Sequence, residues 1–234
     1  MKIVELVGIP GSGKSYILPE FKKRYNTNEK VFLYNDLISQ FILEQLPALS
    51  FLKILPTKIQ NKIFSKIYFS QKYDIIFQDK FEKQYASLIK FIKNYNDKRP
   101  IKLEYKAAIF KWFLKTGEYY LLSENVKAKG VLIIDEGFVQ RVSSLFISEL
   151  ENKILKEDIV SYLKLIPKFS KLIYVERDFN LCLRSRVENP GYRLKGSDND
   201  EIKKVLKINQ TALTMAYSIL KKETKLVASI VINK

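Results

Sequence analysis

Eight residues near the start of the chain have the spacing of a phosphate-binding loop. Gly8-Ile9-Pro10-Gly11-Ser12-Gly13-Lys14-Ser15 matches the pattern G-x-x-x-x-G-K-[ST] at every fixed position. Glycines let the backbone turn its N–H groups toward phosphate oxygens, and the start of a following helix attracts the same anion. We expect Lys14 to reach the β- and γ-phosphates and the Ser15 hydroxyl to bind Mg²⁺. The residues expected at the nucleotide are Gly8, Pro10, Gly11, Ser12, Gly13, Lys14, Ser15 and Tyr16.

The residues around the loop have the context that this pattern requires. Ile3–Val7 is typical of a buried strand, and Tyr16–Tyr25 is typical of a helix that Pro19 would kink. Four further apolar runs are expected to be strands, namely Val31–Tyr34, Val131–Asp135, Leu172–Val175 and Leu226–Ile232. Continuous apolar runs that alternate with helical patterns indicate a parallel sheet buried on both faces. We therefore predict an α/β, three-layer sandwich with a five-stranded parallel sheet, as a single domain over residues 1–234.

A long segment separates the second and third of these strands. Residues 37–129 are too many for a loop, so the segment is predicted to be a helical insertion that leans on the sheet and binds the acceptor. Pro56 and Pro100 are expected to mark breaks between its helices. One apolar stripe with helical spacing consists of Phe81, Tyr85, Leu88, Ile92 and Tyr95.

An acidic pair follows the third predicted strand. Asp135 and Glu136 come directly after Leu132-Ile133-Ile134. Because parallel strands end at the same edge of the sheet, Asp135 is expected beside the loop, where it would hold Mg²⁺ through water. Glu136 is placed to contact substrate or to polarise a water molecule.

The charge balance favours anionic partners. Lysine and arginine number 41 against 25 acidic residues, a net charge of +16, and the stretch Lys53–Lys115 carries 15 basic and 5 acidic residues together with many aromatics. Basic residues interleaved with aromatics can bind single-stranded nucleic acid. We favour the simpler interpretation, in which amphipathic helices have aromatic cores and solvated lysine faces.

The residue types that the chain lacks exclude several kinds of site. The chain has no histidine, which excludes an imidazole base and histidine-ligated metals. Cys182 is the single cysteine, so no intrachain disulfide can form and a cytoplasmic location is expected. Apolar runs such as Val131–Ile134 are far shorter than the roughly 18 residues of a membrane span, so none is expected.

The loop, its strand and helix, and the later acidic pair together resemble the P-loop kinases of the nucleoside-monophosphate-kinase fold. That group includes thymidylate and deoxynucleoside kinases, shikimate kinase, and the chloramphenicol-phosphotransferase and zeta-toxin type. The resemblance extends over the whole chain in element order and is specific at Gly8–Ser15. It implies ATP as the phosphate donor and Mg²⁺ as the metal.

The resemblance also implies roles for side chains outside the loop. Asp36, just after the second strand, is similar in position to an aspartate that binds the acceptor hydroxyl and acts as base; the alternative is that it caps the next helix, and the two roles are compatible. Residues 177–197 resemble a mobile lid, in which Arg184 foremost, then Arg186 and Arg193, would close over the phosphates. Glu136 and Arg141 are similar in position to residues that contact the acceptor.

Three functions follow from these patterns. We favour a phosphotransferase that moves the γ-phosphate of ATP to a hydroxyl or phosphate of a small molecule, such as a nucleoside, nucleotide or sugar. The second is an ATPase in which Glu136 activates water. The third is a kinase that acts on nucleic acid through the basic, aromatic insertion.

Overall fold

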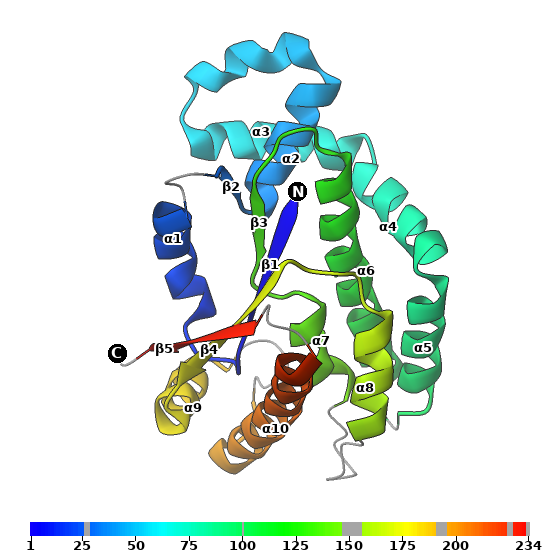
Figure 1. Cartoon of the computed structure of the whole chain (residues 1–234), viewed down its shortest axis with the longest axis vertical. Helices are drawn as coiled ribbons and strands as arrows, with labels where there is room; N and C mark the ends of the chain where they lie inside the picture. The colour runs from blue at the N-terminus through cyan, green and yellow to red at the C-terminus, as the bar shows by residue number, and fades with distance from the viewer. Residues whose placement is uncertain (26–28, 100, 147–155, 191–195, 224–226, 233–234) are drawn as a thin grey trace.

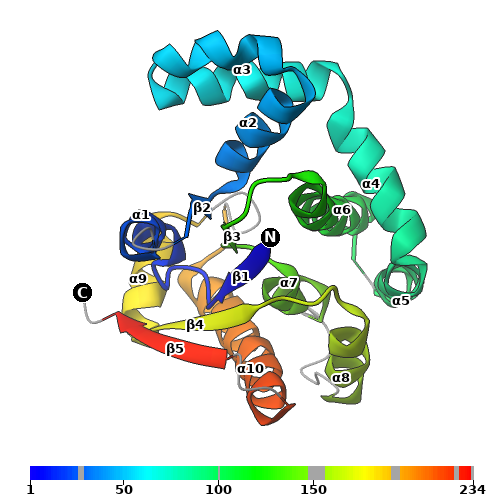
Figure 2. The ribbon, with the colours of Figure 1, turned by 45° about the horizontal axis from the view of Figure 1, so that its top comes forward.

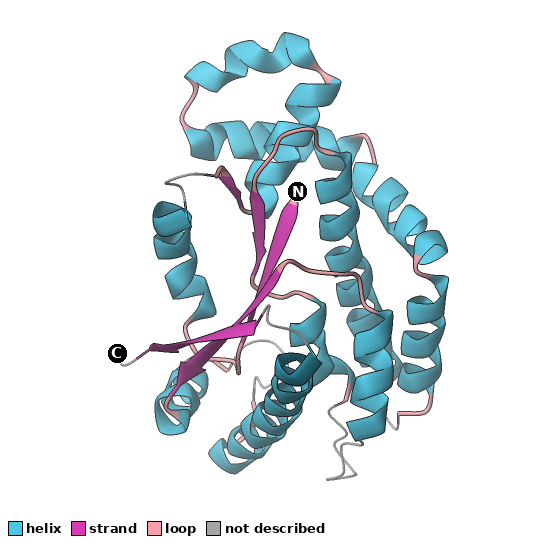
Figure 3. Cartoon of the chain, viewed as in Figure 1, coloured by secondary structure: helices cyan, strands magenta, loops and turns pink. Residues whose placement is uncertain are grey.

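The strands form one parallel sheet, and the Gly8–Ser15 loop follows its central strand. The computed structural model describes residues 1–234 except 26–28, 100, 147–155, 191–195, 224–226 and 233–234. Within the described residues the strands are β1 (Lys2–Val7), β2 (Val31–Phe32), β3 (Val131–Ile134), β4 (Lys171–Arg177) and β5 (Val227–Ile232). Their order across the sheet is β2-β3-β1-β4-β5, and every neighbouring pair is parallel (Figure 3). The predicted five-stranded parallel sheet is confirmed.

Helices fill the connections between the strands. The helices before β3 are α1 (Lys14–Tyr25), α2 (Tyr34–Gln45), the 3₁₀ helix η1 (Pro47–Ile54), α3 (Thr57–Ser70), α4 (Tyr73–Gln84), α5 (Ala86–Asp97) and α6 (Leu103–Asn125). Those after it are α7 (Phe138–Leu145), α8 (Lys156–Leu165), α9 (Phe179–Glu188) and α10 (Asn199–Glu223). All the elements from α2 to α6 lie between β2 and β3 in the chain and occupy the upper and right parts of Figure 1. No helix in the described residues is long and apolar enough to cross a bilayer.

The sheet is covered on both faces. Val4, Leu6 and Val131 belong to a small apolar cluster with Ile17 of α1 on one face. The other face belongs to a larger cluster that continues into α6, α7, α8 and α10 and outward to α2–α5 (Figure 2). This arrangement, helices on either side of a parallel sheet, is consistent with the predicted three-layer sandwich.

Two strand boundaries differ from prediction by two residues, and in both cases local contacts give the reason; the starts of β1 and β4 and the end of β3 differ by one residue. β2 ends at Phe32 rather than at Tyr34, because the Leu33 N–H donates to the Asp36 carboxylate at 3.0 Å and α2 begins at Tyr34. β4 continues to Arg177, two residues beyond the predicted Val175, through its pairing with β5.

The apolar stripe predicted in the helical segment lies on two helices, α4 and α5. α4 ends at Gln84 and α5 begins at Ala86, so the chain bends at Tyr85, whose φ and ψ are −115° and 40°. Phe81, Leu88 and Ile92 nevertheless face the core and are buried. Pro56 directly precedes α3, which confirms the predicted break there, and Pro100 lies outside the described residues.

A buried carboxylate in the central strand fixes the position of α7. Glu5 of β1 is fully buried and accepts hydrogen bonds from the backbone N–H of Phe138 at 2.8 Å and of Val139 at 2.9 Å, and from the Tyr120 hydroxyl. Burial raises the pKa of Glu5, and these three donors oppose that shift by favouring the ionised form. Only glycine fits at position 137, because an added Cβ would lie 2.1 Å from the Glu5 Cδ.

A second buried carboxylate joins the helices between β2 and β3. Glu118 of α6 is fully buried and accepts hydrogen bonds from the Tyr68 hydroxyl at 3.0 Å, from Gln78 at 2.9 Å and from the Tyr34 hydroxyl. The Lys115 ammonium lies 2.9 Å from the same carboxylate. These partners come from α2, α3, α4 and α6, so one charged group ties four helices together.

We expect Glu5→Gln to lower the free energy of unfolding by about 2–4 kcal/mol, because the new amide turns an N–H toward donors that need an acceptor. Glu44→Gln is the matched control. Glu44 also accepts two backbone N–H groups, from Lys127 and Ala128, but it is only half-buried. That change should cost about 1 kcal/mol or less. Equal losses in urea denaturation of the two variants would contradict the special role given to Glu5.

Candidate functional site

The Gly8–Ser15 loop connects β1 to α1 and forms one wall of a cavity of about 360 Å³. Gly11 and Gly13 have φ values of +86° and +90°, which residues with a side chain rarely adopt. The other walls come from the turn after β3, from α7, from the end of β4 and from α9. The lining residues are Pro10, Gly11, Gly13, Lys14, Ser15, Tyr16, Asp135, Glu136, Gln140, Arg177, Ser185 and Arg186. We call this space the loop cavity.

Lys14 lies with its ammonium group inside the loop. Its Nζ donates to the Gly8 carbonyl at 2.7 Å and lies 3.5 Å from the Ile9 carbonyl. Burial lowers the pKa of Lys14 to about 8, although the negative charges of Glu136 and Asp135 oppose the shift. The charge of this side chain is therefore sensitive to pH just above neutrality.

The predicted metal-binding residues come together in the loop cavity. Ser15 and Asp135 both line it, and Asp135 directly follows β3, which pairs with β1. Burial raises the pKa of Asp135, as does Glu136, while Lys14 and Arg141 act in the opposite direction. A hydroxyl and a carboxylate are oxygen donors of the kind that Mg²⁺ prefers, so the donor set fits this ion.

The remaining predicted loop residues occupy different depths. Tyr16 is 65 % exposed at the rim, whereas Ser12 is buried and its hydroxyl makes no hydrogen bond within the described residues. Gly8 lies beneath the cavity and donates its N–H to the Gln140 side chain at 3.0 Å.

The arginines of α9 point in different directions. The Asp178 carboxylate caps the start of this helix, and the Gly11 backbone packs against Cys182 so closely that an added Cβ would lie 2.7 Å from its carbonyl oxygen. Arg186 consequently lines the loop cavity, and burial lowers its pKa. Arg184 is two residues away, or about 200° around a helix, and pairs with Glu188 in solvent at 3.2 Å with 79 % of its side chain exposed.

Arg184 therefore does not line the cavity, unlike Arg186, although the sequence placed it first. Arg193 falls outside the described residues, as does part of the predicted lid over 177–197.

Three residues that line the loop cavity, Arg177, Ser185 and Gln140, were not predicted as site residues from the sequence. Arg177, the last residue of β4, donates from Nη1 to the Gly11 carbonyl at 2.8 Å. Gln140 of α7 holds the Gly8 N–H, as described above. An arginine at the carboxyl end of a strand beside β1 is a signal that sequence reasoning could have used, whereas nothing in the sequence pointed to Gln140.

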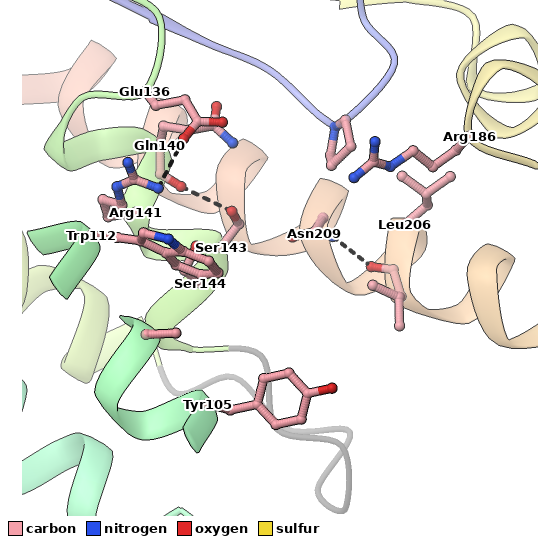
Figure 4. A pocket seen from close by; sticks show the side chains of 13 residues that line it. Tyr105, Trp112, Glu136, Gln140, Arg141, Ser143, Ser144, Arg186, Leu206 and Asn209 are labelled. Carbon is pink, nitrogen blue, oxygen red and sulfur yellow. Dashed lines mark hydrogen bonds and ion pairs between the residues drawn. The ribbon is translucent and has the colours of Figure 1, made fainter. Parts of the chain in front are cut away.

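A second cavity adjoins the first. It has a volume of about 340 Å³ and shares Pro10, Glu136, Gln140 and Arg186 with the loop cavity. The side chains of α6, α7 and α10 form the rest of its lining, including Tyr105, Trp112, Arg141, Ser143, Ser144 and Asn209 (Figure 4). We call this space the α6–α10 cavity.

Arg141 of α7 and Glu136, in the turn after β3, both line the α6–α10 cavity. Their side chains lie 3.0 Å apart, and Arg141 also donates from Nε to the Thr116 hydroxyl at 3.2 Å. The Arg141 guanidinium carbon lies 5.7 Å from the Trp112 ring centre, close enough for a cation–π contact. Glu136 and Arg141, the two residues predicted to contact the acceptor, thus lie together at the α6–α10 cavity.

Asp36 is not brought to either cavity. Its carboxylate accepts the Leu33 N–H at the start of α2 and lies 2.7 Å from the Lys22 ammonium. A smaller space of about 170 Å³ at the ends of β2 and β3 is lined by the neighbouring Tyr34 and Asn35 and by Asp135, but not by Asp36. This geometry is that of the helix cap weighed as the alternative for this residue.

No protein-family model matches the chain, and no curated protein matches it with significant similarity.

The pKa of Lys14 gives a test of the loop. The protonated form is the one that attracts phosphates, so affinity for ATP should hold below pH 8 and fall as the pH rises through about 8. Between pH 7 and pH 9.5 we expect about a 10- to 30-fold loss in equilibrium dialysis. Lys14→Arg keeps its charge over this range and should bind ATP with little pH dependence. The same slope in that variant would place the titration at another group.

Proposed function

We propose that this chain is a phosphotransferase that moves the γ-phosphate of ATP to a hydroxyl or phosphate of a small molecule. The observation that carries the proposal is the pair of adjoining cavities. One contains a glycine-rich loop, a lysine and two arginines, which suit a triphosphate. The other is lined by aromatic, amide and hydroxyl side chains, which suit an organic acceptor. Because the two cavities share a wall, a donor and an acceptor bound in them would lie side by side.

In the donor half, the loop N–H groups and Lys14 would bind the phosphates. Lys14 exchanges its bond to the Gly8 carbonyl for one to a phosphate oxygen, whose negative charge favours the protonated ammonium. Arg186 at the shared wall neutralises charge that develops on the transferred group, and Arg177 holds the loop through Gly11. Ser15 and Asp135 would hold Mg²⁺, which supplies further neutralisation of the phosphates when bound.

In the acceptor half, Trp112 offers a flat apolar surface, and Asn209 and Gln140 offer hydrogen bonds. The acceptor oxygen attacks the γ-phosphorus, the bond to the β-phosphate oxygen breaks, and a hydroxyl acceptor releases one proton. Glu136 lies at the boundary of the two cavities with 59 % of its side chain exposed, so it is the carboxylate that this geometry favours as proton acceptor. Asp36, the residue that the resemblance suggests, is engaged at the start of α2.

The proposal includes a cytoplasmic location, which the free and buried Cys182 thiol supports.

The direct test uses ATP labelled at the γ-phosphate, Mg²⁺ and a cell extract separated into metabolite and nucleic-acid fractions. We expect label to enter a small molecule, and Lys14→Ala to reduce the rate at least about 100-fold because it removes a charge that stabilises the transferred group. Lys207→Ala removes an exposed lysine of α10 and should leave the rate unchanged. Label in polynucleotide alone would make nucleic acid the acceptor.

The same assay shows whether Glu136 or Asp36 accepts the proton. Glu136→Gln should slow transfer by about 100-fold or more, whereas Asp36→Asn should act mainly on stability. The reverse result would restore Asp36 as the base. Release of free phosphate without any labelled product, abolished by Glu136→Gln, would show an ATPase instead.

Trp112 tests the acceptor cavity separately from the donor. With the acceptor labelled in that assay, Trp112→Ala should raise its KM about 10- to 50-fold and leave the KM for ATP within about twofold, because Trp112 lines only the α6–α10 cavity. Trp112→Phe keeps a flat ring and should recover most of the affinity. A matching rise in the KM for ATP would argue against two separate half-sites.

A further inference from the structure

The end of the molecule formed by η1 and the start of α3 combines exposed apolar and basic side chains. Ile54 is 87 % exposed, Phe51 62 % and Ile59 48 %. The exposed lysines Lys53, Lys58 and Lys62 lie between and beside them in the chain. We call these six residues the η1–α3 surface.

η1 is unusual because it is apolar and yet has no fully buried residue: its Leu49 and Leu52 pack against the core, whereas Phe51 and Ile54 are exposed. Its sequence, Pro-Ala-Leu-Ser-Phe-Leu-Lys-Ile, holds five aliphatic or aromatic side chains, and none of its residues is buried. It lies at the top of Figure 1, at one end of the long axis, and Gln60 of α3 ties it down by donating to the Lys53 carbonyl at 3.2 Å. Exposed apolar groups that are held in place in this way mark a contact surface.

The charge around this surface has one sign. From Gln45 to Tyr73 the chain carries five lysines and no acidic residue. Lys53, Lys58 and Lys62 make no ion pair within the described residues. The partner that complements this surface is therefore both apolar and negatively charged.

Two kinds of macromolecule fit less well. Protein interfaces are depleted in lysine, which costs entropy and desolvation to bury. Single-stranded nucleic acid stacks on exposed aromatic rings, but Phe64, Tyr68 and Phe81 are buried. Phe51 is the one aromatic residue among the six of the η1–α3 surface, and the other two apolar residues are isoleucines.

We propose that the η1–α3 surface docks on an anionic lipid bilayer, with Phe51, Ile54 and Ile59 entering the boundary between headgroups and acyl chains and the three lysines contacting lipid phosphates. Apolar residues flanked by lysine on a short, surface-lying helical segment have the chemistry of an interfacial anchor. This proposal does not depend on the phosphotransferase function, because the surface lies outside both cavities.

The test is flotation of the full chain with vesicles of phosphatidylcholine alone and of phosphatidylcholine with phosphatidylglycerol at a ratio of about 3:1. We expect binding to the anionic vesicles only. Lys53→Gln, Lys58→Gln and Lys62→Gln together should weaken it roughly 100-fold, because each lysine near an anionic surface contributes about a factor of five. Ile54→Ser with Ile59→Ser should weaken it about tenfold or more.

Matched controls distinguish this surface from the overall charge of +16. Lys203→Gln, Lys204→Gln and Lys207→Gln remove three exposed lysines of α10, and Leu103→Ser removes a side chain that is 80 % exposed on α6. Neither should change vesicle binding beyond about twofold. Equal losses in the control and surface variants, or no vesicle binding at all, would overturn the proposal. Binding of a single-stranded oligonucleotide that is lost only in the surface variants would assign the surface to nucleic acid.

Discussion

The geometry of the candidate site depends on a carboxylate buried in the central strand. Glu5 binds the first two N–H groups of α7, and this sets where α7 starts relative to β1. The next residue of α7, Gln140, accepts the N–H of Gly8, so one end of α7 contacts β1 at Glu5 and the loop that follows β1 at Gly8. A charge in a dry interior is costly unless hydrogen-bond donors contact it. Three donors contact the Glu5 carboxylate, and because two of them are N–H groups of α7, the same bonds also position that helix.

α6 connects this part of the sheet to the helices between β2 and β3. Trp112, Thr116 and Tyr120 are spaced four residues apart and share one face of the helix, which lines the α6–α10 cavity, holds Arg141 and reaches Glu5 in succession. Lys115 and Glu118 lie on the opposite side and gather α2, α3 and α4. A single rigid helix therefore connects the two buried carboxylates, which is why the helices between β2 and β3 have a fixed position beside the sheet.

The sequence predicted the parts of this structure that depend on neighbours in the chain. The loop of Gly8–Ser15 is local, and the run that ends in Asp135 reads directly as a buried strand, so the sheet and the meeting of Lys14, Ser15 and Asp135 at its edge follow from periodicity and strand order. β2 was the exception. Its last residues have strand propensity, but the Asp36 carboxylate offers the Leu33 N–H a closer partner and starts a helix instead.

What the sequence could not predict depends on helix phase and on contacts between distant segments. Arg184 and Arg186 are the same residue type in one helix, so the sequence alone does not distinguish them. The packing of α9 against Gly11 decides that Arg186 faces the cavity. The lining of the proposed acceptor cavity is even harder to predict from the sequence, because Trp112, Gln140 and Asn209 come from three helices and belong to no motif. A phosphate needs only a loop of consecutive N–H groups, whereas an organic acceptor must be recognised by shape. In the proposed enzyme, substitutions on α6 and α10 can therefore change the acceptor while the loop that binds the donor stays the same.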